Sequence, residues 1–393
     1  MIPYILVFIL LLYFSFRYDL SEKKTDGKRS SEIIMLIVLI CFAGLRNRVG
    51  SDTIDYMDDY EMAPTLTELL NNKYLLEEII QPLWAIFMSF CKTISESFVL
   101  FQFAHAILFN LLLFNFVKHT TNKVFLFFLF FYCIDWWNYS FEILRESLCV
   151  VIFLNALSYY FRTKKILVYI GICIPALLIH WMAFVPILIT PLCFFIKDKK
   201  LILFMVLIGA SFFLWDTSSL NNLIMMAAFS SESTTRIADY MDSDRYGANS
   251  VNIIGLIIVL VVYILLPLLI YRYKKKSDTD NALSRLMPFY ILIAMVGIKM
   301  PIINRLLHYY QIPLLVLCVN CLFSNTANNT FRRNDNLVRV TCIMLLLLNT
   351  FLSINTFYKP SQIETRGNVR YNAIFIPYTT VFEDPDPIRE GLY

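Results

Sequence analysis

Charged side chains are scarce in this sequence. Lysine, arginine, aspartate and glutamate make up 16% of the 393 residues, whereas hydrophobic residues make up 58%. Soluble domains are about a quarter charged, so this composition predicts a protein that is surrounded largely by lipid and has no separate soluble domain. The net charge of +4 is small and scattered, and it does not favour a nucleic-acid partner.

The motifs of several enzyme classes are also missing. The chain has no P-loop, no G-x-G-x-x-G, no H-E-x-x-H and no nucleophile elbow, so chemistry driven by ATP or NAD has no support. Most of the nine cysteines lie inside apolar runs, as buried thiols do. Cys318 and Cys321 form a C-x-x-C inside such a run, where we do not expect redox or metal chemistry.

Long apolar runs, in contrast, recur along the whole chain. A helix that spans a membrane needs roughly 20 apolar residues, and several of the runs are shorter than this. The first run lacks a basic start and a cleavage site of small residues, so we expect a retained span rather than a signal peptide. The predicted membrane segments are 2–17, 33–45, 79–94, 98–117, 124–137, 143–161, 166–180, 182–196, 201–217, 252–273, 285–299, 304–323 and 338–357.

Lysines and arginines indicate how these segments are oriented. Short loops rich in Lys and Arg stay in the cytoplasm, and such clusters follow the first, sixth, eighth, tenth and twelfth segments. This pattern places loops 46–78 and 218–250, together with the tail 358–393, on the outer side. Lysines in loop 118–123 favour a location inside as well, which leaves one net crossing between residues 78 and 117. Either segment 79–94 is re-entrant or interfacial, which we predict, or loop 118–123 is an exception to the rule.

We therefore predict an all-α fold, a polytopic membrane helix bundle that forms one domain over residues 1–393. It has about twelve crossings plus the re-entrant segment, both termini outside, and outer loops that are partly helical. The stretch 166–196 is too long for one helix, and we expect a tight pair hinged near His180.

Charges in or beside membrane segments mark candidate functional residues, because a charge at the bilayer centre costs about 2.5–3.5 kcal/mol. The first group follows the second segment, where Arg46 and Arg48 precede Gly50, Asp52 and Tyr56. The alternative is that both arginines only extend to the interface and pair with nearby aspartates.

The second group lies at the start of the sixth segment. On a helix, Glu142 and Arg145 are three residues apart and Glu146 is one turn from Glu142, so the three side chains share a face. Two acids and an arginine that enter an apolar helix need a polar or charged group to face them. Trp136 and Trp137 precede this set, and their alternative role is an aromatic belt at the interface.

Two further groups are predicted on the outer side. His180 lies at the end of an apolar helix, where it is either a hydrogen-bonded structural residue, a general base or a ligand for a polar group. Lys299 and Arg305 bracket an outer turn between two segments, and the alternative for them is interfacial anchoring.

A short acidic pattern is the only hint of a metal. Asp242 and Asp244 form a D-x-D, with which many glycosyltransferases hold a divalent metal, but Asp384 and Asp386 match this loose pattern equally well. We therefore predict no metal site and no cofactor.

Arginines recur in three of these groups. A guanidinium binds two phosphate oxygens at once and stays charged close to lipid. A lipid-linked diphosphate carries its charge at the same depth and its tail between helices. The arginines therefore indicate such a diphosphate as the ligand.

Five segments in order make the chain similar to a known family. They are GLRNRVGSDTIDYMDDYE, with a G-L-R and a V-G-[ST]-D; FEILRESLCVVIFLNALSYYFRTKK, with an E-x-x-R; YIGICIPALLIHWMAFVPILI, with an A-x-x-x-H; INRLLHYYQIP; and NAIFIPYTTVF. With these motifs the chain resembles the EpsG-like (Wzy-type) family of bacterial polysaccharide and O-antigen polymerases. It departs from the family pattern at Gln81, where a Glu is frequent, and at Glu146, where an amide is frequent.

The resemblance implies a polymerase in the bacterial inner membrane with its active site facing the periplasm. It would transfer a growing glycan from undecaprenyl diphosphate to a lipid-linked repeat unit during assembly of exopolysaccharide, capsule or O-antigen. The implied partners are the undecaprenyl-diphosphate-linked oligosaccharide, the lipid bilayer, and a chain-length regulator and a flippase of the same pathway.

This reaction assigns roles to the candidate residues. Fixed guanidinium groups stabilise the charge that develops on the leaving diphosphate. A base deprotonates the attacking hydroxyl, and His180 ranks before Glu142 and Asp52 for this task. Aromatic rings pack on sugar faces. The candidates are Arg46, Arg48, Arg145 and Arg305 for the diphosphate, His180, Glu142 and Asp52 for proton transfer, and Tyr56, Trp136 and Trp137 for the sugar.

Three alternatives stay open. Another lipid-linked glycosyltransferase or a glycan ligase would use arginines in the same way, but it would not make a ladder of repeats. A glycolipid flippase or transporter needs paired halves and polar groups near the midplane of the bilayer, and the sequence indicates neither. A structural membrane scaffold is the third alternative.

Overall fold

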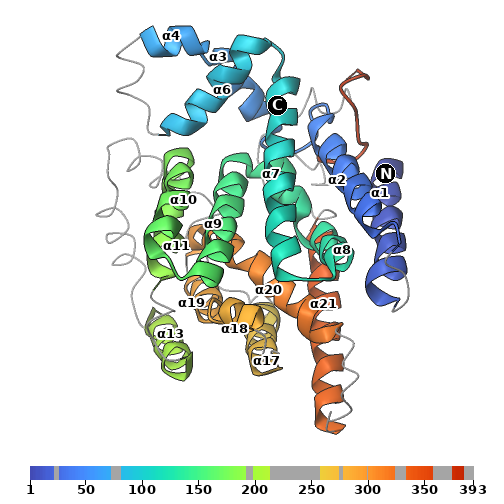
Figure 1. The fold of residues 1–393 in the computed structure, drawn as a ribbon, viewed down its shortest axis with the longest axis vertical. Helices are drawn as coiled ribbons and strands as arrows, with labels where there is room; N and C mark the ends of the chain where they lie inside the picture. Colours follow the sequence, from blue (N-terminus) through green and yellow to red (C-terminus); the bar gives the residue numbers. More distant parts are fainter. Residues whose placement is uncertain are drawn as a thin grey trace. The chain divides into compact units, whose positions relative to one another are not determined.

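The computed structural model describes residues 1–21, 26–71, 81–191, 198–212, 257–273, 278–298, 300–323, 333–356 and 374–384. Over these residues every regular element is a helix, and the only β-type pairing is an isolated bridge (Figure 1). The predicted all-α fold is therefore confirmed for this part of the chain. The chain divides into two compact units, Met1–Ile187 with Thr350–Tyr393, and Leu188–Asn349.

Membrane character is visible in the helices themselves. Four helices within the described residues are long and apolar enough to cross a membrane, namely Ile2–Leu20, Phe98–Thr120, Leu144–Thr163 and Ile302–Leu322. Shorter apolar helices cover Pro82–Ile94, Val124–Ile134, Ile166–Ile179, Leu260–Tyr271 and Arg339–Asn355. About twelve crossings remain a prediction, because these shorter helices fall below the length of a full span.

The first unit is built around the long helix α7 (Phe98–Thr120). Ser97 precedes it, and the Ser97 hydroxyl accepts a hydrogen bond from the Val99 N–H, which caps the helix. α7 packs against α2 and α9, and α9 packs along α10 (Figure 1). The elements of this unit are α1 (Ile2–Phe14), η1 (Ser15–Leu20), α2 (Lys28–Gly44), α3 (Thr53–Met62), α4 (Leu66–Asn71), α6 (Pro82–Ile94), α7, α8 (Val124–Ile134), η2 (Asn138–Glu142), α9 (Leu144–Thr163), α10 (Ile166–Ile179) and η3 (Trp181–Ala183).

Two basic loops of this unit lie side by side. Lys28 Nζ is 3.1 Å from Asp19 Oδ1 and donates a hydrogen bond to the Asn122 carbonyl at 2.8 Å. Lys118 Nζ forms an ion pair with Glu32 Oε2 at 2.6 Å. The loop after the first segment and loop 118–123 are therefore neighbours, which supports their predicted location on one side of the membrane. α6 is thirteen residues long, or about 20 Å at 1.5 Å per residue. The re-entrant or interfacial location of segment 79–94 stays a prediction.

The C-terminal tail packs on the loop after α2. Residues 46 and 380 form an antiparallel bridge, the Asn47 N–H donates to the Thr379 carbonyl at 2.8 Å, and the Val381 N–H donates to the Leu45 carbonyl at 2.9 Å. The described tail, residues 374–384, thus lies beside the outer loop although more than 300 positions separate them in the chain. Both segments were predicted to be outside.

The second unit consists of shorter helices. α19 (Met287–Gly297) packs on α13 (Asp198–Phe212), η5 (Pro301–Leu307) and η4 (Val259–Leu265). Asn320 Nδ2 donates to Asp280 Oδ1 at 2.8 Å, which ties α20 (His308–Leu322) to α18 (Asp278–Ser284). α17 (Leu266–Tyr273) also belongs to this unit, and α11 (Phe184–Ile189) and α21 (Arg333–Thr356) cross the boundaries between the units.

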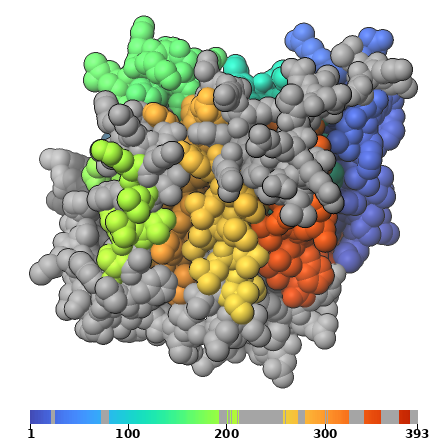
Figure 2. All heavy atoms as spheres, turned by 90° about the horizontal axis from the view of Figure 1, so that it is seen from below, coloured from blue at the N-terminus to red at the C-terminus, as the bar shows by residue number. Residues whose placement is uncertain are grey.

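Leucines are exposed on the helices of the second unit. Leu203 and Leu207 of α13 are each 60% exposed, and Leu260 of η4 is 47% exposed. Both elements lie at the surface in the space-filling view (Figure 2). Exposed apolar side chains of this kind suit contact with lipid rather than water.

Candidate active site

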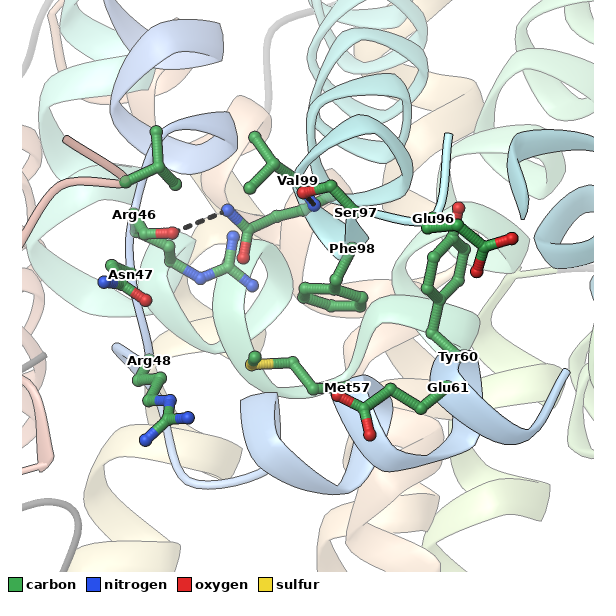
Figure 3. Close-up of a pocket in the computed structure, with 12 residues that line it drawn as sticks. Arg46, Asn47, Arg48, Met57, Tyr60, Glu61, Glu96, Ser97, Phe98 and Val99 are labelled. Carbon is green, nitrogen blue, oxygen red and sulfur yellow. Dashed lines mark hydrogen bonds between the residues drawn. The ribbon is translucent and has the colours of Figure 1, made fainter. Parts of the chain in front are cut away.

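The loop between α2 and α3 begins with a close helix contact. A Cβ at Gly44 would lie 2.4 Å from Phe103 Cδ2, so only glycine lets α2 approach α7 at this point. From α7, Gln102 Nε2 donates to the Gly44 carbonyl at 2.8 Å and to the Arg46 carbonyl at 2.9 Å. The bond at Arg46 is dashed in Figure 3. The loop is thereby fixed to the longest helix of its unit.

Arg46 stabilises this loop from inside. Its side chain is only 2% exposed, and it donates hydrogen bonds to the carbonyls of Ala43 and Val49. Its guanidinium carbon lies 4.6 Å from the ring centroid of Phe141, which is a cation–π distance. Burial lowers the pKa of Arg46 to about 10, against the opposing effect of nearby groups that include Glu142. These contacts indicate a structural task for Arg46, and contact with a diphosphate stays a prediction.

Two residues with positive φ turn the chain after Arg46. Arg48 has a φ of 51° and Gly50 a φ of 117°. Arg48 is half-buried and lines a pocket of about 180 Å³. Figure 3 shows Arg48 at one side of this pocket, below Arg46 and Asn47. The other lining residues are Met57, Tyr60, Glu61, Glu96, Ser97, Phe98, Val99, Gln102 and Val381.

Glu142 anchors the far end of the loop. Its Oε1 accepts a hydrogen bond from the Ser51 N–H at 2.6 Å, and its Oε2 accepts one from the Asp52 N–H at 3.2 Å. Burial, with a smaller contribution from the charge of Asp52, raises the pKa of Glu142 above its usual value, although the two N–H donors and Arg46 act in the opposite direction. Since both carboxylate oxygens accept hydrogen bonds at the start of α3, a role as the base that takes the acceptor proton is less well supported for Glu142.

Glu142→Gln is expected to destabilise the protein by about 1–3 kcal/mol, because the amide NH₂ must face one of two buried N–H donors. The measurement is the free energy of unfolding, or the melting temperature, of the purified protein in detergent. Glu61→Gln, on the exposed face of α3, is the matched control and should change little. Equal melting temperatures for the two variants would contradict the anchoring role.

Three side chains from three different helices meet beside α3. Arg145 Nη1, in the first turn of α9, donates to Gln81 Oε1 at 3.4 Å. The same amide places Nε2 3.2 Å from Nδ1 of His180, which follows α10. The guanidinium carbon of Arg145 lies 5.6 Å from the ring centroid of Tyr56. Arg145, His180 and Tyr56 are thus brought together as the sequence predicted.

Asp52 also belongs to this cluster. It is the residue directly before α3, and it lies close enough to Tyr56 and Glu142 for its charge to raise the pKa of both groups. Burial, with a smaller contribution from Asp52, raises the pKa of Tyr56 to about 12, although Arg145 acts in the opposite direction. A carboxyl group, a phenol and a guanidinium therefore lie within one small region. Among the described residues, no carboxylate lies within 4.0 Å of the Arg145 guanidinium.

The side chains of the two candidate tryptophans, Trp136 and Trp137, are packed against other parts of the first unit. Trp136 is completely buried and donates from Nε1 to Asn110 Oδ1 at 3.3 Å. Trp137 stacks on Tyr4 with ring centroids 4.3 Å apart. Trp136 therefore packs in the core of its unit, and sugar binding by either ring stays a prediction.

The remaining candidates lie outside the first unit or outside the described residues. Arg305 lies in the last turn of η5 in the second unit, and its role is a prediction from the sequence. Asp242, Asp244 and Lys299 lie outside the described residues. The described residues contain no group of three or more His, Cys, Asp or Glu side chains that could bind a metal ion. The sequence singled out Gln81 only as a departure from the family pattern, and it did not predict that this side chain connects Arg145 with His180.

One of three comparisons with known proteins gives a match. The model of the EpsG family matches residues 32–380, which is most of the chain and includes every candidate site residue. Neither the curated proteins nor the solved structures contain a match. The resemblance that the ordered motifs indicated is confirmed. The protein, with its apolar helices, is a membrane protein that belongs to the EpsG family of glycosyltransferase-like polysaccharide polymerases.

Proposed function

We propose that the protein transfers a growing glycan from undecaprenyl diphosphate to a lipid-linked repeat unit at the periplasmic face of the inner membrane. The observation that carries the proposal is Arg145. Its half-buried guanidinium lies at the start of an apolar helix with no carboxylate of the described residues in ion-pair range. A cation in the first turn of a helix is unfavourable unless an anion neutralises it, and a diphosphate is such an anion.

The reaction needs little besides charge and position. The acceptor hydroxyl oxygen forms a bond to the anomeric carbon, the bond from that carbon to the phosphate oxygen breaks, and undecaprenyl diphosphate leaves with the electron pair. The proton of the hydroxyl passes to a base of the protein. Arg145 stabilises the negative charge that grows on the leaving oxygen.

The proposed roles of the other candidate residues rest on different observations. Tyr56 lies under the Arg145 guanidinium, where its ring can also pack on a sugar. Arg48 and Arg305 are proposed as further diphosphate ligands, Arg48 because it lines a pocket on the same loop and Arg305 from the sequence alone. Arg46, since it donates to carbonyls of its own loop, would act by holding that loop in place.

A polymerisation assay tests the proposal. The purified full-length protein in lipid vesicles receives lipid-linked repeat units extracted from the producing cells, with and without a metal chelator. A ladder of products that survives chelation is the expected result. A single addition would favour another lipid-linked glycosyltransferase or a ligase, transport without reaction would favour a flippase, and loss of the ladder on chelation would indicate a metal.

A further inference from the structure

The hydrogen bonds around Gln81 fix the state of His180. A guanidinium only donates hydrogen bonds, so the atom of Gln81 that faces Arg145 Nη1 at 3.4 Å must be the carbonyl oxygen. The amide nitrogen then faces His180 Nδ1 at 3.2 Å and donates to it. A ring nitrogen that accepts has no proton, so the proton of neutral His180 lies on Nε2.

This tautomer decides what His180 can do. With the proton on Nε2, that nitrogen donates a hydrogen bond, and it cannot remove a proton from a hydroxyl. The basic nitrogen, Nδ1, is occupied by Gln81. Since Gln81 is neutral, it adds no negative charge beside Arg145.

On the basis of the proposed function, we propose that Gln81 is a positioning residue that presents His180 as a hydrogen-bond donor beside Arg145. The two side chains together bind the diphosphate, and Asp52 takes the proton of the acceptor hydroxyl. Asp52 suits this task because it lies in the same cluster, next to Tyr56. Its charge raises the pKa of both Tyr56 and Glu142. Glu142 itself is engaged by two backbone N–H groups.

Within the described residues, several ionisable groups lie on the elements that pack around His180. On α9 these are Arg145, Glu146 and Cys149, and the Cys149 thiol donates to the Ala176 carbonyl of α10 at 3.2 Å. On α6 the only charged residue is Lys92, which pairs with Glu96 at 2.9 Å. The helix α10 carries no charged residue, and its ionisable side chains are the buried Tyr169 and Cys173, whereas the turn η3 has no ionisable side chain. A carboxylate in place of Gln81 would therefore be expected to determine which ring nitrogen of His180 carries the proton.

Gln81→Glu is the sharpest test. A carboxylate at this position accepts from Nδ1–H, so neutral His180 would switch its proton to Nδ1 and present a bare Nε2. If His180 acts as a donor, the polymerisation rate of Gln81→Glu falls as the pH rises through the His180 titration, because only the imidazolium keeps a proton on Nε2. If His180 acts as the base, the rate rises with pH instead, and that result would overturn the proposal.

Substitution of His180 gives a second, independent readout. Glutamine cannot act as a base, but its amide can donate from a position close to Nε2, so we expect His180→Gln to retain activity within about tenfold of the wild type. His180→Ala should lose about 100-fold or more, and so should Asp52→Asn. His119→Gln, at an exposed position on α7, is the matched control and should be unchanged.

The experiment uses full-length protein in vesicles and the repeat units extracted from the producing cells, with rates recorded across pH 5–9. Equal loss in His180→Gln and His180→Ala, together with an active Asp52→Asn, would contradict the proposal alone. If Arg145→Ala also polymerises normally, the proposed active site itself is wrong. The two failures are therefore distinguishable.

Discussion

Arg145→Ala is expected to lower the rate of polymerisation by about 100- to 1,000-fold, the usual loss when one group that stabilises a developing charge is removed. The variant should still fold, since Arg145 is half-buried and the hydrogen bond from its Nη1 to Gln81 is long, at 3.4 Å. The loss should appear in kcat more than in KM if the guanidinium acts on the leaving diphosphate. The measurement is product-ladder formation with saturating lipid-linked repeat units.

Two controls make this result specific. Arg162→Ala changes an arginine at the other end of the same helix, where Nε donates to the Ser158 carbonyl at 3.3 Å, and it should polymerise normally. Arg145→Lys keeps the charge but loses the bidentate geometry, so an intermediate rate is expected. If Arg145→Ala and Arg305→Ala both leave polymer length and yield unchanged in cells, the arginines do not bind the diphosphate.

Gly50→Ala is expected to destabilise the protein and to abolish most of its activity. Gly50 has a φ of 117°, a conformation that costs a residue with a Cβ about 1–3 kcal/mol. The added Cβ would also lie 2.7 Å from Thr53 Oγ1 and 3.1 Å from Glu142 Oε1. Relief of these contacts would move Glu142 away from the Ser51 N–H and would displace Asp52 with it.

The same substitution elsewhere in the first unit provides the control. Gly171 lies on an exposed face of α10, and a Cβ there would meet nothing within 4 Å. Gly171→Ala should therefore raise the stability by about 0.5–1 kcal/mol through helix propensity. Melting temperatures in detergent and product ladders report both variants. A Gly50→Ala protein that melts and polymerises as the wild type does would refute the account of this turn.

Arg46 illustrates how burial changes the meaning of a motif. The sequence presented Arg46 and Arg48 as an equal pair at a membrane interface. In the structure, Arg46 is 2% exposed and donates to the carbonyls of its own loop, whereas Arg48 lines a pocket. A buried guanidinium that stabilises a loop and one that faces a ligand have the same local sequence, because the difference lies in the helices that surround them.

The sequence by itself determined the helical fold, the lipid environment and the family. These properties depend on hydropathy, charge and the order of short motifs, all of which are local along the chain. It also predicted Asp52, Tyr56, Arg145 and His180 as candidate residues of one site, since their charges or hydrogen-bonding groups occur where apolar segments end. Their functional roles stay a prediction.

Only the tertiary structure decided how these residues are connected. The contact of Gln81 with both Arg145 and His180 joins three helices, and the pairing of Arg46 with Thr380 joins positions at opposite ends of the chain. Such contacts depend on how helices pack, and helix packing is a cooperative property of the whole unit rather than of any segment. The tautomer of His180 follows from these contacts, and for that reason no local pattern could indicate it.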